Sequence, residues 1–396
     1  MNKFKLDFKK CVAIIFVFFI VVSGVLTIAA NPVKILGGLA RGYMDSPKES
    51  NILEKIGNGF STFDGRMSDY YIFHDQSINA YGFLQKSMGV TLIDDVDPSY
   101  EVLKLKNGYL TFKSTHFHDY SDLNNYLLIL NKVCKTTGTD LLYVNKISKE
   151  AIDKRLLPDN YPYVFGSNYD DLEKSLLSND IDVLNIESII KEKNIDKYSL
   201  FFKTDHHWTP KTGLWVSQLI CENLNVNFEY KLNTELFDIN KYNIDTYNNS
   251  FLGSQGKRVG MYYNGVDDLD VIIPKYDTAL ELTINDEAVN LVGNFENTMI
   301  HRECITPDNL LNKDAIAYDV YMLGNHSLVN IENKKIESGK KALIIMDSYG
   351  CVVAPYLSQA FKNLDCIDLR SYTDSLEDYI IKTSPDVVIY MATNYQ

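Results

Sequence analysis

Four consecutive residues, Asp205-His206-His207-Trp208, combine a carboxylate, two imidazoles and an indole. A carboxylate two residues before an imidazole can accept the Nδ1–H of the ring, which fixes the tautomer and stabilises the imidazolium. The Nε2 atom of His207 then remains free to act as a general base. This stretch therefore offers an acid–base pair, Asp205 and His207, and lacks only a nucleophile.

The residues that follow predict the start of a helix. Thr209 is a suitable N-cap, and Pro210 fits the first helical position. We expect the helix to continue over 211–224. The four residues then lie on a turn just before a helix, where side chains can project into a cleft.

Ser348 is the nucleophile that we assign. It lies in Asp347-Ser348-Tyr349-Gly350, directly after the buried apolar strand that we expect over 342–346. In open α/β sheets, ligands bind at the carboxyl ends of the strands, and the N-terminus of a following helix favours negative charge. The alternative is that Ser348 only caps this helix, which we expect over 353–361. Because the acid–base pair of Asp205 and His207 lies elsewhere in the chain, we favour the interpretation of Asp205, His207 and Ser348 as a triad.

Apolar runs and helical spacings alternate on both sides of these motifs. We expect strands over 141–144, 181–186, 342–346, 364–369 and 387–391, and helices over 123–133, 172–177, 211–224, 353–361 and 376–381. This alternation predicts an α/β fold with a doubly wound parallel sheet. The stretch from about 235 to 335 is rich in Asn, Asp and Tyr, and we expect it to form an irregular insertion.

Composition narrows the class of protein. The 396 residues carry a net charge of -13, which argues against a nucleic-acid partner. The six cysteines include no Cys-x-x-Cys pair, so neither a zinc knuckle nor a disulfide framework is expected. We expect no metal and no other cofactor.

The N-terminus predicts a membrane segment. Residues 11–30 contain no charged side chain, and about 20 apolar residues span a bilayer. Lysines before this span hold the N-terminus in the cytoplasm. The alternative is a cleaved signal peptide, whose apolar core is usually ~7–15 residues long. We expect a cytoplasmic end over 1–10, a transmembrane anchor over 11–30, a stalk over 31–60 and an extracellular domain over 61–396.

The two motifs together carry a resemblance to a known family. Asp205-His206-His207-Trp208 with Asp347-Ser348-Tyr349-Gly350 resembles the DHHW protein family, which is similar to the SGNH-like domains of alginate O-acetyltransferases of the AlgJ and AlgX type. The resemblance extends over most of the chain, from about residue 63 to residue 395. It implies an SGNH-hydrolase-like fold, circularly permuted because the Asp–His block precedes the Ser block.

The resemblance also implies roles for residues. Carried over, it gives Asp205, His207 and Ser348 as the catalytic residues. Met346 departs from the usual glycine of a Gly-Asp-Ser block, and no clear Gly-x-Asn-Asp block follows Ser348. The candidates for the oxyanion hole and for substrate binding are Arg370, Tyr372, Asn394 and Asn325.

The implied activity is O-acyl transfer, with acetyl as the expected group, to an extracellular polysaccharide. A membrane-bound O-acyltransferase is the implied acyl donor. With water as acceptor, the same triad makes a polysaccharide deacetylase or esterase. Two other readings stay open, namely a metal-dependent phosphoesterase, because Asp-His-His also occurs in that class, and a catalytically silent carbohydrate-binding or scaffold protein.

Overall fold

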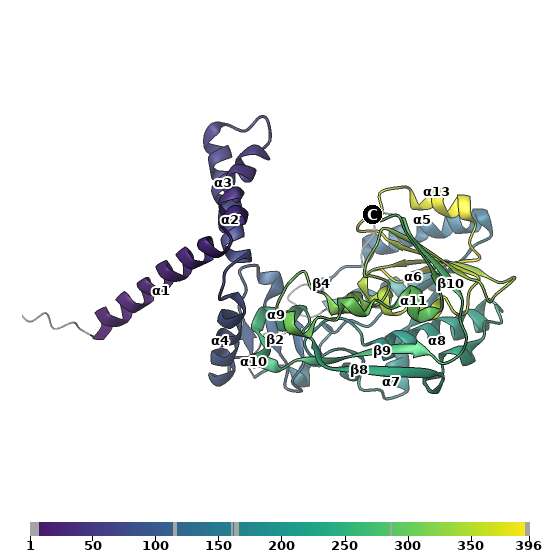
Figure 1. Cartoon of the computed structure of the whole chain (residues 1–396). Helices are drawn as coiled ribbons and strands as arrows, with labels where there is room; N and C mark the ends of the chain where they lie inside the picture. Colours follow the sequence, from purple (N-terminus) through teal and green to yellow (C-terminus); the bar gives the residue numbers. More distant parts are fainter. Residues whose placement is uncertain (1–7, 114–116, 160, 162–165, 286, 393–396) are drawn as a thin grey trace, which may run out of the picture. The chain divides into compact units, whose positions relative to one another are not determined.

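The computed structural model describes the chain except for residues 1–7, 114–116, 160, 162–165, 286 and 393–396 (Figure 1). The chain divides into two compact units, of which the first ends at Leu84 and the second begins at Gln85. The sequence places the start of the globular domain at residue 61. In the structure, residues 61–84 belong to the first unit, and all of them except 70–73 are helical.

The first unit is helical. It contains α1 (Phe8–Ala30), α2 (Pro32–Met44), α3 (Ile52–Asp69) and most of α4 (His74–Ser87). α2 and α3 lie against each other, because Gly42 and Gly59 allow a close approach that a Cβ atom at either position would block. α3 begins with a capping box between Asn51 and Glu54. α1 is long and apolar enough to cross a membrane, as the sequence predicts.

An eight-stranded sheet forms the centre of the second unit, in the order β11-β10-β12-β14-β13-β15-β5-β7. Its strands are β5 (Asp140–Asn145), β7 (Asp182–Asn185), β10 (Leu280–Ile284), β11 (Val289–Gly293), β12 (Leu328–Asn333), β13 (Lys341–Met346), β14 (Asn363–Asp368) and β15 (Val387–Tyr390). The strands from β14 to β7 are parallel, whereas β12, β10 and β11 are added antiparallel at one edge. The predicted α/β fold is confirmed, and the sheet is mixed.

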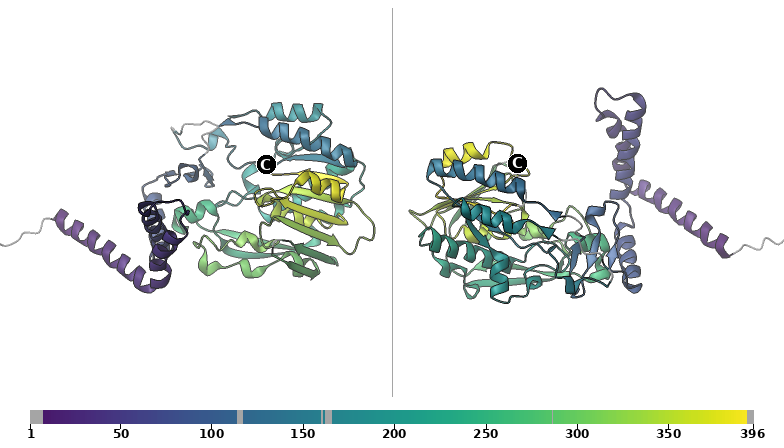
Figure 2. Two further views of the ribbon diagram at one scale, coloured as in Figure 1. Left: turned by 90° about the horizontal axis from the view of Figure 1, so that it is seen from above. Right: turned by 180° about the vertical axis from the view of Figure 1, so that it is seen from behind.

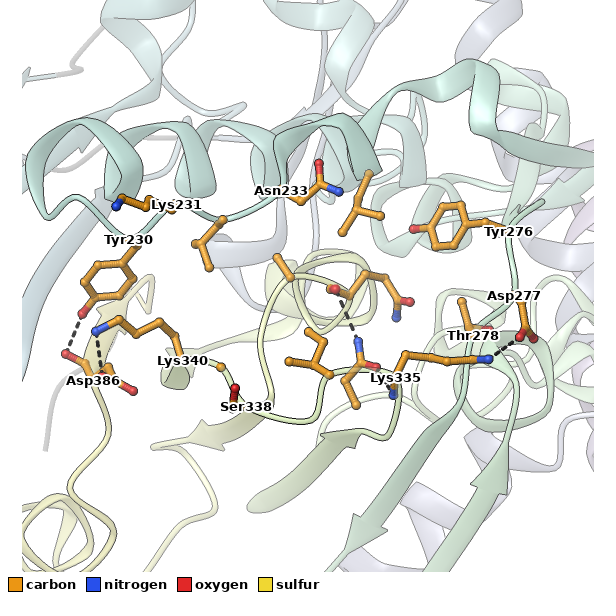
Figure 3. Close-up of a pocket in the computed structure, with 17 residues that line it drawn as sticks. Tyr230, Lys231, Asn233, Tyr276, Asp277, Thr278, Lys335, Ser338, Lys340 and Asp386 are labelled. Atoms are coloured by element: carbon orange, nitrogen blue, oxygen red, sulfur yellow. Dashed lines mark hydrogen bonds and ion pairs between the residues drawn. The ribbon is translucent and has the colours of Figure 1, made fainter.

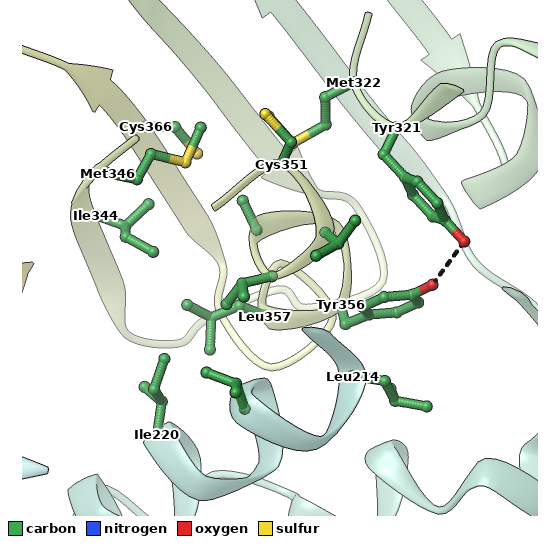
Figure 4. Packing of buried hydrophobic residues seen from close by; sticks show 14 of the residues in the cluster. Leu214, Ile220, Tyr321, Met322, Ile344, Met346, Cys351, Tyr356, Leu357 and Cys366 are labelled. Carbon is green, nitrogen blue, oxygen red and sulfur yellow. Dashed lines mark hydrogen bonds between the residues drawn. The ribbon is translucent and has the colours of Figure 1, made fainter. Parts of the chain in front are cut away.

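Helices cover both faces of this sheet (Figures 1 and 2). Leu343 and Ile345 of β13 face a core formed with α5 (Ser121–Thr137), α6 (Tyr169–Ser178) and α13 (Leu376–Thr383). Ile344 and Met346 face the opposite core, formed with α8 (Pro210–Asn227), as Figure 4 shows. A strand covered on both faces reads as a continuous apolar run, which is why β13 was recognisable in the sequence.

The stretch over 235–335 is more regular than the sequence predicts. β8 (Tyr242–Phe251) and β9 (Asp267–Pro274) form a long antiparallel ribbon, and β10 to β12 extend the main sheet. β10 buries alternate residues, the pattern of a strand with one covered face.

Shorter elements complete the second unit. Three strands, β1 (Leu92–Ile93), β2 (Val102–Lys104) and β3 (Leu110–Phe112), form a small antiparallel sheet. The remaining strands and α-helices are β4 (Phe117–His118), β6 (Gly166–Ser167), α7 (Ile186–Glu192), α9 (Ser254–Val259), α10 (Met261–Asn264), α11 (Phe295–Met299) and α12 (Ala354–Leu357).

The segment after β13 departs from the expected helix over 353–361. It forms a 3₁₀ helix, η9 (Ser348–Val352), and then the four-residue α12. Every residue from Cys351 to Phe361 is buried, so the apolar run carries no one-sided helical period. η9 and α12 pack against α8, which brings the two sequence motifs to the same region of the fold.

Gly213, in the first turns of α8, permits this packing. A Cβ atom at this position would overlap the carbonyl oxygen of Val352 at the end of η9. Inside a helix, alanine normally stabilises over glycine by about 1 kcal/mol. At Gly213 we expect alanine to destabilise the protein instead, since the overlap is a case of overpacking, which typically costs about 1–3 kcal/mol.

Gly213→Ala should therefore lower the melting temperature in differential scanning calorimetry. Gly57→Ala is the matched control, because Gly57 is also helical and a Cβ atom there would meet nothing within 4 Å. If Gly213→Ala melts at or above the wild-type temperature, the close approach of α8 and η9 is not required.

Candidate active site

The Asp-His-His-Trp stretch forms a closed loop at the start of α8. Phe201 and Trp208 form an antiparallel bridge, and the Phe202 N–H donates to the His207 carbonyl at 3.3 Å. Thr209 caps α8 through its side chain, with Pro210 in the first turn, as predicted. Trp208 is fully buried, and its ring packs edge-on to Tyr349 at 5.1 Å.

The carboxylate of Asp205 lies at the centre of this loop and is 3% exposed. Its Oδ1 accepts the backbone N–H of His207 at 2.8 Å and lies 2.5 Å from Nδ1 of the His207 ring. Its Oδ2 accepts the backbone N–H of Ser254 at 2.5 Å. Burial alone would raise the pKa of Asp205. The neighbouring imidazoles of His207 and His206 and these hydrogen bonds outweigh burial and hold the pKa well below its usual range.

Gly253, just before α9, lets the backbone approach Asp205. A Cβ atom on Gly253 would overlap the Asp205 side chain. The absence of a side chain therefore allows the Ser254 N–H to reach Oδ2 of Asp205. The glycine-containing loop over 251–260 thus fixes the carboxylate from the side opposite His207.

Two further charged groups hold the loop. Asp267 of β9 accepts hydrogen bonds from the backbone N–H groups of Lys203 and Thr204, at 3.0 and 2.7 Å. Nζ of Lys149 donates to the carbonyl oxygens of Phe202, Lys203 and Asp205, at 2.7, 3.3 and 2.7 Å. Lys149 is 1% exposed, and burial lowers its pKa to about 7. An ammonium group has three N–H donors, so these three carbonyls match its protonated form.

The structure brings Ser348 to His207. Oγ of Ser348 lies 2.7 Å from Nε2 of His207, although the two residues are 141 positions apart. An ionised carboxylate only accepts hydrogen bonds, so Nδ1 of His207 carries the proton and Nε2 accepts from the Ser348 hydroxyl. This is the hydrogen-bond sequence that activates a serine in a triad.

Aromatic rings hold His207 in place. Tyr318 stacks on the imidazole with a centroid distance of 4.4 Å and an interplanar angle of 21°. The ring of His206 lies 3.9 Å from the His207 ring. Nδ1 of His206 lies 2.9 Å from Oγ of Ser254, and burial lowers the pKa of His206 to about 4.

Asp347 has a structural position. Its carboxylate caps η9 by accepting the Tyr349 N–H at 3.2 Å, and it pairs with Nζ of Lys146 from the loop after β5. The same Nζ lies 4.5 Å above the Tyr349 ring. Tyr349 in turn donates its hydroxyl to the His206 carbonyl at 2.8 Å. These contacts tie the Ser348 turn to the Asp-His-His-Trp loop.

A cavity of about 360 Å³ opens beside Ser348. Its lining includes Arg370, Lys146 and Glu150, together with Tyr120, Tyr143 and Tyr349. Among the predicted substrate-binding residues, Arg370 lines this cavity, where it also forms a two-bond pair with Asp368.

The other predicted substrate-binding residues do not gather there. Tyr372 is buried in the core with α5 and α13, beside Tyr379, and is not among the residues that line the cavity. Asn325 is exposed and accepts a long hydrogen bond of 3.6 Å from the thiol of Cys351, away from the lining of the cavity. Asn394 lies outside the described residues.

Asp205, His206 and His207 could also hold a metal ion, since one ligand atom from each lies within 4.8 Å of the others. In the observed arrangement both ring nitrogens of His207 already face Asp205 and Ser348. A metal bound to His207 would therefore have to replace one of these hydrogen bonds.

A larger cavity of the second unit lies elsewhere. It measures about 750 Å³ and is lined by Lys340 and Asp386, which precede β13 and β15 at the end of the sheet opposite Ser348 (Figure 3). Four of its charged side chains form ion pairs, Lys340 with Asp386 and Lys335 with Asp277. The volume is larger, but this cavity contains no nucleophile with a neighbouring base.

The sequence analysis missed several residues of the site. Lys146, Lys149 and Glu150 directly follow β5, and their place after a buried strand was the available signal. Tyr318 and Asp267 come from the stretch over 235–335, where no local pattern indicated a role.

Comparison with known proteins agrees with this fold. A family model described as an SGNH hydrolase-like domain, acetyltransferase AlgX, matches residues 113–239, a range that contains the Asp-His-His-Trp loop. No curated protein matches the sequence.

Two solved structures have a similar fold at low sequence identity. A DHHW family protein from Eubacterium siraeum is 18% identical, with 76% of this chain and 93% of that chain covered and a TM-score of 0.55. Bacillus cereus PatB1 with a sulfonyl adduct is 18% identical, with 74% and 93% covered and a TM-score of 0.57. The predicted resemblance to DHHW proteins and to the SGNH-like AlgX domain is confirmed.

The hydrogen bonds from the buried Lys149 ammonium group to the loop carbonyls lead to a prediction. Lys149→Met keeps a long side chain but leaves the carbonyl oxygens of Phe202 and Asp205 without their donor, whereas the Lys203 carbonyl still accepts from the Leu110 N–H. An unsatisfied buried polar group costs about 1–3 kcal/mol, so we expect the free energy of unfolding in urea to fall by at least that amount. Lys203→Met, on the same loop but exposed, should change it by less than about 0.5 kcal/mol. Equal effects of the two variants would contradict a stabilising role of the Lys149 hydrogen bonds.

Proposed function

We propose that this protein is a membrane-anchored O-acyltransferase that modifies a cell-surface polysaccharide through an acyl-enzyme on Ser348. The observation that carries the proposal is the hydrogen-bond chain from Ser348 through His207 to Asp205, with Ser348 at the carboxyl end of the central strand. The match to an acetyltransferase family model supports an acyl-transferring enzyme.

The proposed reaction has two halves. In the first, Nε2 of His207 takes the Ser348 proton while Oγ attacks the acyl carbon, and the protonated ring then gives that proton to the leaving group. In the second, Nε2 takes the proton of an acceptor hydroxyl, the acceptor oxygen bonds to the acyl carbon, and Oγ of Ser348 leaves and recovers a proton. Asp205 holds the ring and stabilises the imidazolium in both halves.

Transferase and esterase share the first half and differ in the acceptor. With a sugar hydroxyl the product is a new ester, and with water it is the free acid. The cavity of about 360 Å³ beside Ser348 has room for a sugar in either reaction, and the match to an acetyltransferase family model favours the transferase.

The triad is tested by the release of p-nitrophenol from p-nitrophenyl acetate by the full-length protein. Ser348→Ala and His207→Ala should each reduce release by about 10³-fold or more, and Asp205→Asn should be severe because the ring loses its tautomer control. Ser338→Ala, an exposed serine at the opposite end of the sheet, is the matched control. Full activity of Ser348→Ala would refute the acyl-enzyme.

Chelation separates the metal-dependent alternative. The triad needs no metal ion, so activity should survive EDTA, and His206→Ala should keep most of it. Loss of activity with EDTA and recovery with Zn²⁺ or Mn²⁺ would instead favour a metal-dependent phosphoesterase that uses Asp205, His206 and His207.

Membrane attachment is part of the proposal. α1 carries no charged side chain from Cys11 to Ala30, and lysines precede this span in the sequence, which favours a cytoplasmic N-terminus. Protease added to intact protoplasts should therefore digest the second unit, while the protein sediments with membranes. Protection of the second unit, or its recovery in the medium, would contradict an anchor with an extracellular domain.

A further inference from the structure

Four neighbouring strands bring their carboxyl ends to the cavity beside Ser348. In the sheet order, β14 leads to Arg370, β13 to Ser348, β15 to Ala392 and β5 to the loop over 145–150. Ser348 therefore lies between a loop that carries Arg370 and a loop that carries Glu150. A molecule in this cavity contacts both loops while one of its atoms faces the serine.

Glu150 is the charged group of this cavity that is not yet accounted for. Lys146 pairs with Asp347, and Arg370 pairs with Asp368. Within the part of the chain that the structure describes, the Glu150 carboxylate has no hydrogen-bond or ion-pair partner. Burial raises the pKa of Glu150, which reflects the water that the carboxylate has already lost. A partly buried carboxylate without donors is poised to accept hydrogen bonds from a ligand.

The rest of the lining fits a sugar ring. Tyr120 and Tyr349, both half-buried, supply aromatic surface on which the apolar face of a pyranose can pack. Glu150 lines the same cavity as Tyr120 and Tyr349. Aromatic faces beside a carboxylate that lacks donors suit a ligand with both C–H faces and hydroxyl groups.

The charges around the cavity favour a neutral sugar. Asp347, Asp368 and Glu150 set three carboxylates against the two cations Lys146 and Arg370. The net charge of these five groups is negative, and each cation already forms an ion pair with an aspartate. A sugar carboxylate would meet repulsion from Glu150 and two cations whose charge is already offset by aspartates, whereas hydroxyl groups can donate to Glu150.

We propose that this cavity is the acceptor subsite and that the Glu150 carboxylate accepts hydrogen bonds from hydroxyl groups of a neutral sugar, whose neighbouring hydroxyl then faces Ser348. The proposal rests on the proposed acyl transfer and adds the class of acceptor. Nε2 of His207 takes the proton of the facing hydroxyl, its oxygen bonds to the acyl carbon, and the bond from that carbon to Oγ of Ser348 breaks.

The test separates the two halves of the reaction. The full-length protein is mixed with p-nitrophenyl acetate, and the burst of p-nitrophenol measures acylation. The steady-state rate is then followed with neutral oligosaccharides of glucose, galactose and N-acetylglucosamine, and with an oligogalacturonate. We expect at least one neutral oligosaccharide, and not the oligogalacturonate, to accelerate turnover.

The Glu150→Ala variant should raise the KM for that acceptor about tenfold or more, with kcat changed by less than about threefold. Glu150→Gln, which keeps the shape and loses the charge, should fall between. Glu192→Ala, an exposed glutamate at the end of α7, is the matched control and should keep the wild-type KM.

The outcomes distinguish the two proposals. Without a wild-type burst, the proposed acyl-enzyme itself fails. With a burst, the subsite assignment is overturned if Glu150→Ala keeps the wild-type KM, if the oligogalacturonate is the preferred acceptor, or if no oligosaccharide accelerates turnover. A burst in Glu150→Ala also shows that the variant is folded.

Discussion

The buried carboxylate of Asp205 accepts hydrogen bonds from the backbone of His207, from its ring and from the backbone of Ser254. A carboxylate removed from water is costly unless such donors surround it. The donors come from two segments that are far apart in sequence, so satisfying this one charge fixes the loop, the orientation of His207 and the approach of the segment at Gly253. The rest of the site is built outward from this constraint.

Two close backbone approaches extend the constraint to Ser348. Gly253 lets the segment after β8 reach Asp205. Gly213 lets α8 lie directly on η9, whose first residue is Ser348. At both positions any side chain would hold the segments apart. The 2.7 Å separation between His207 and Ser348 is thus a consequence of how closely the main chain packs, since neither side chain reaches the other from a looser arrangement.

The sheet explains where substrate can bind. β13 is flanked by β14 and β15, and the chain reverses its direction of travel along the sheet at this point. Loops from adjacent strands therefore separate above Ser348 and leave room between Arg370 and Glu150. The larger cavity at the other end of the sheet has paired charges and no such convergence, which shows that volume alone does not identify a site.

The sequence by itself determined the features that depend on near neighbours. The Asp-His-His-Trp loop, the cap at Thr209, the strand before Ser348 and the apolar N-terminal span follow from patterns a few residues long. What only the tertiary structure decided is which distant segments meet. Lys149, Tyr318 and Glu150 reach the site, and Tyr372 goes to the core, because strand order and burial set their surroundings. These contacts join residues from separate elements, and no local spacing encodes them.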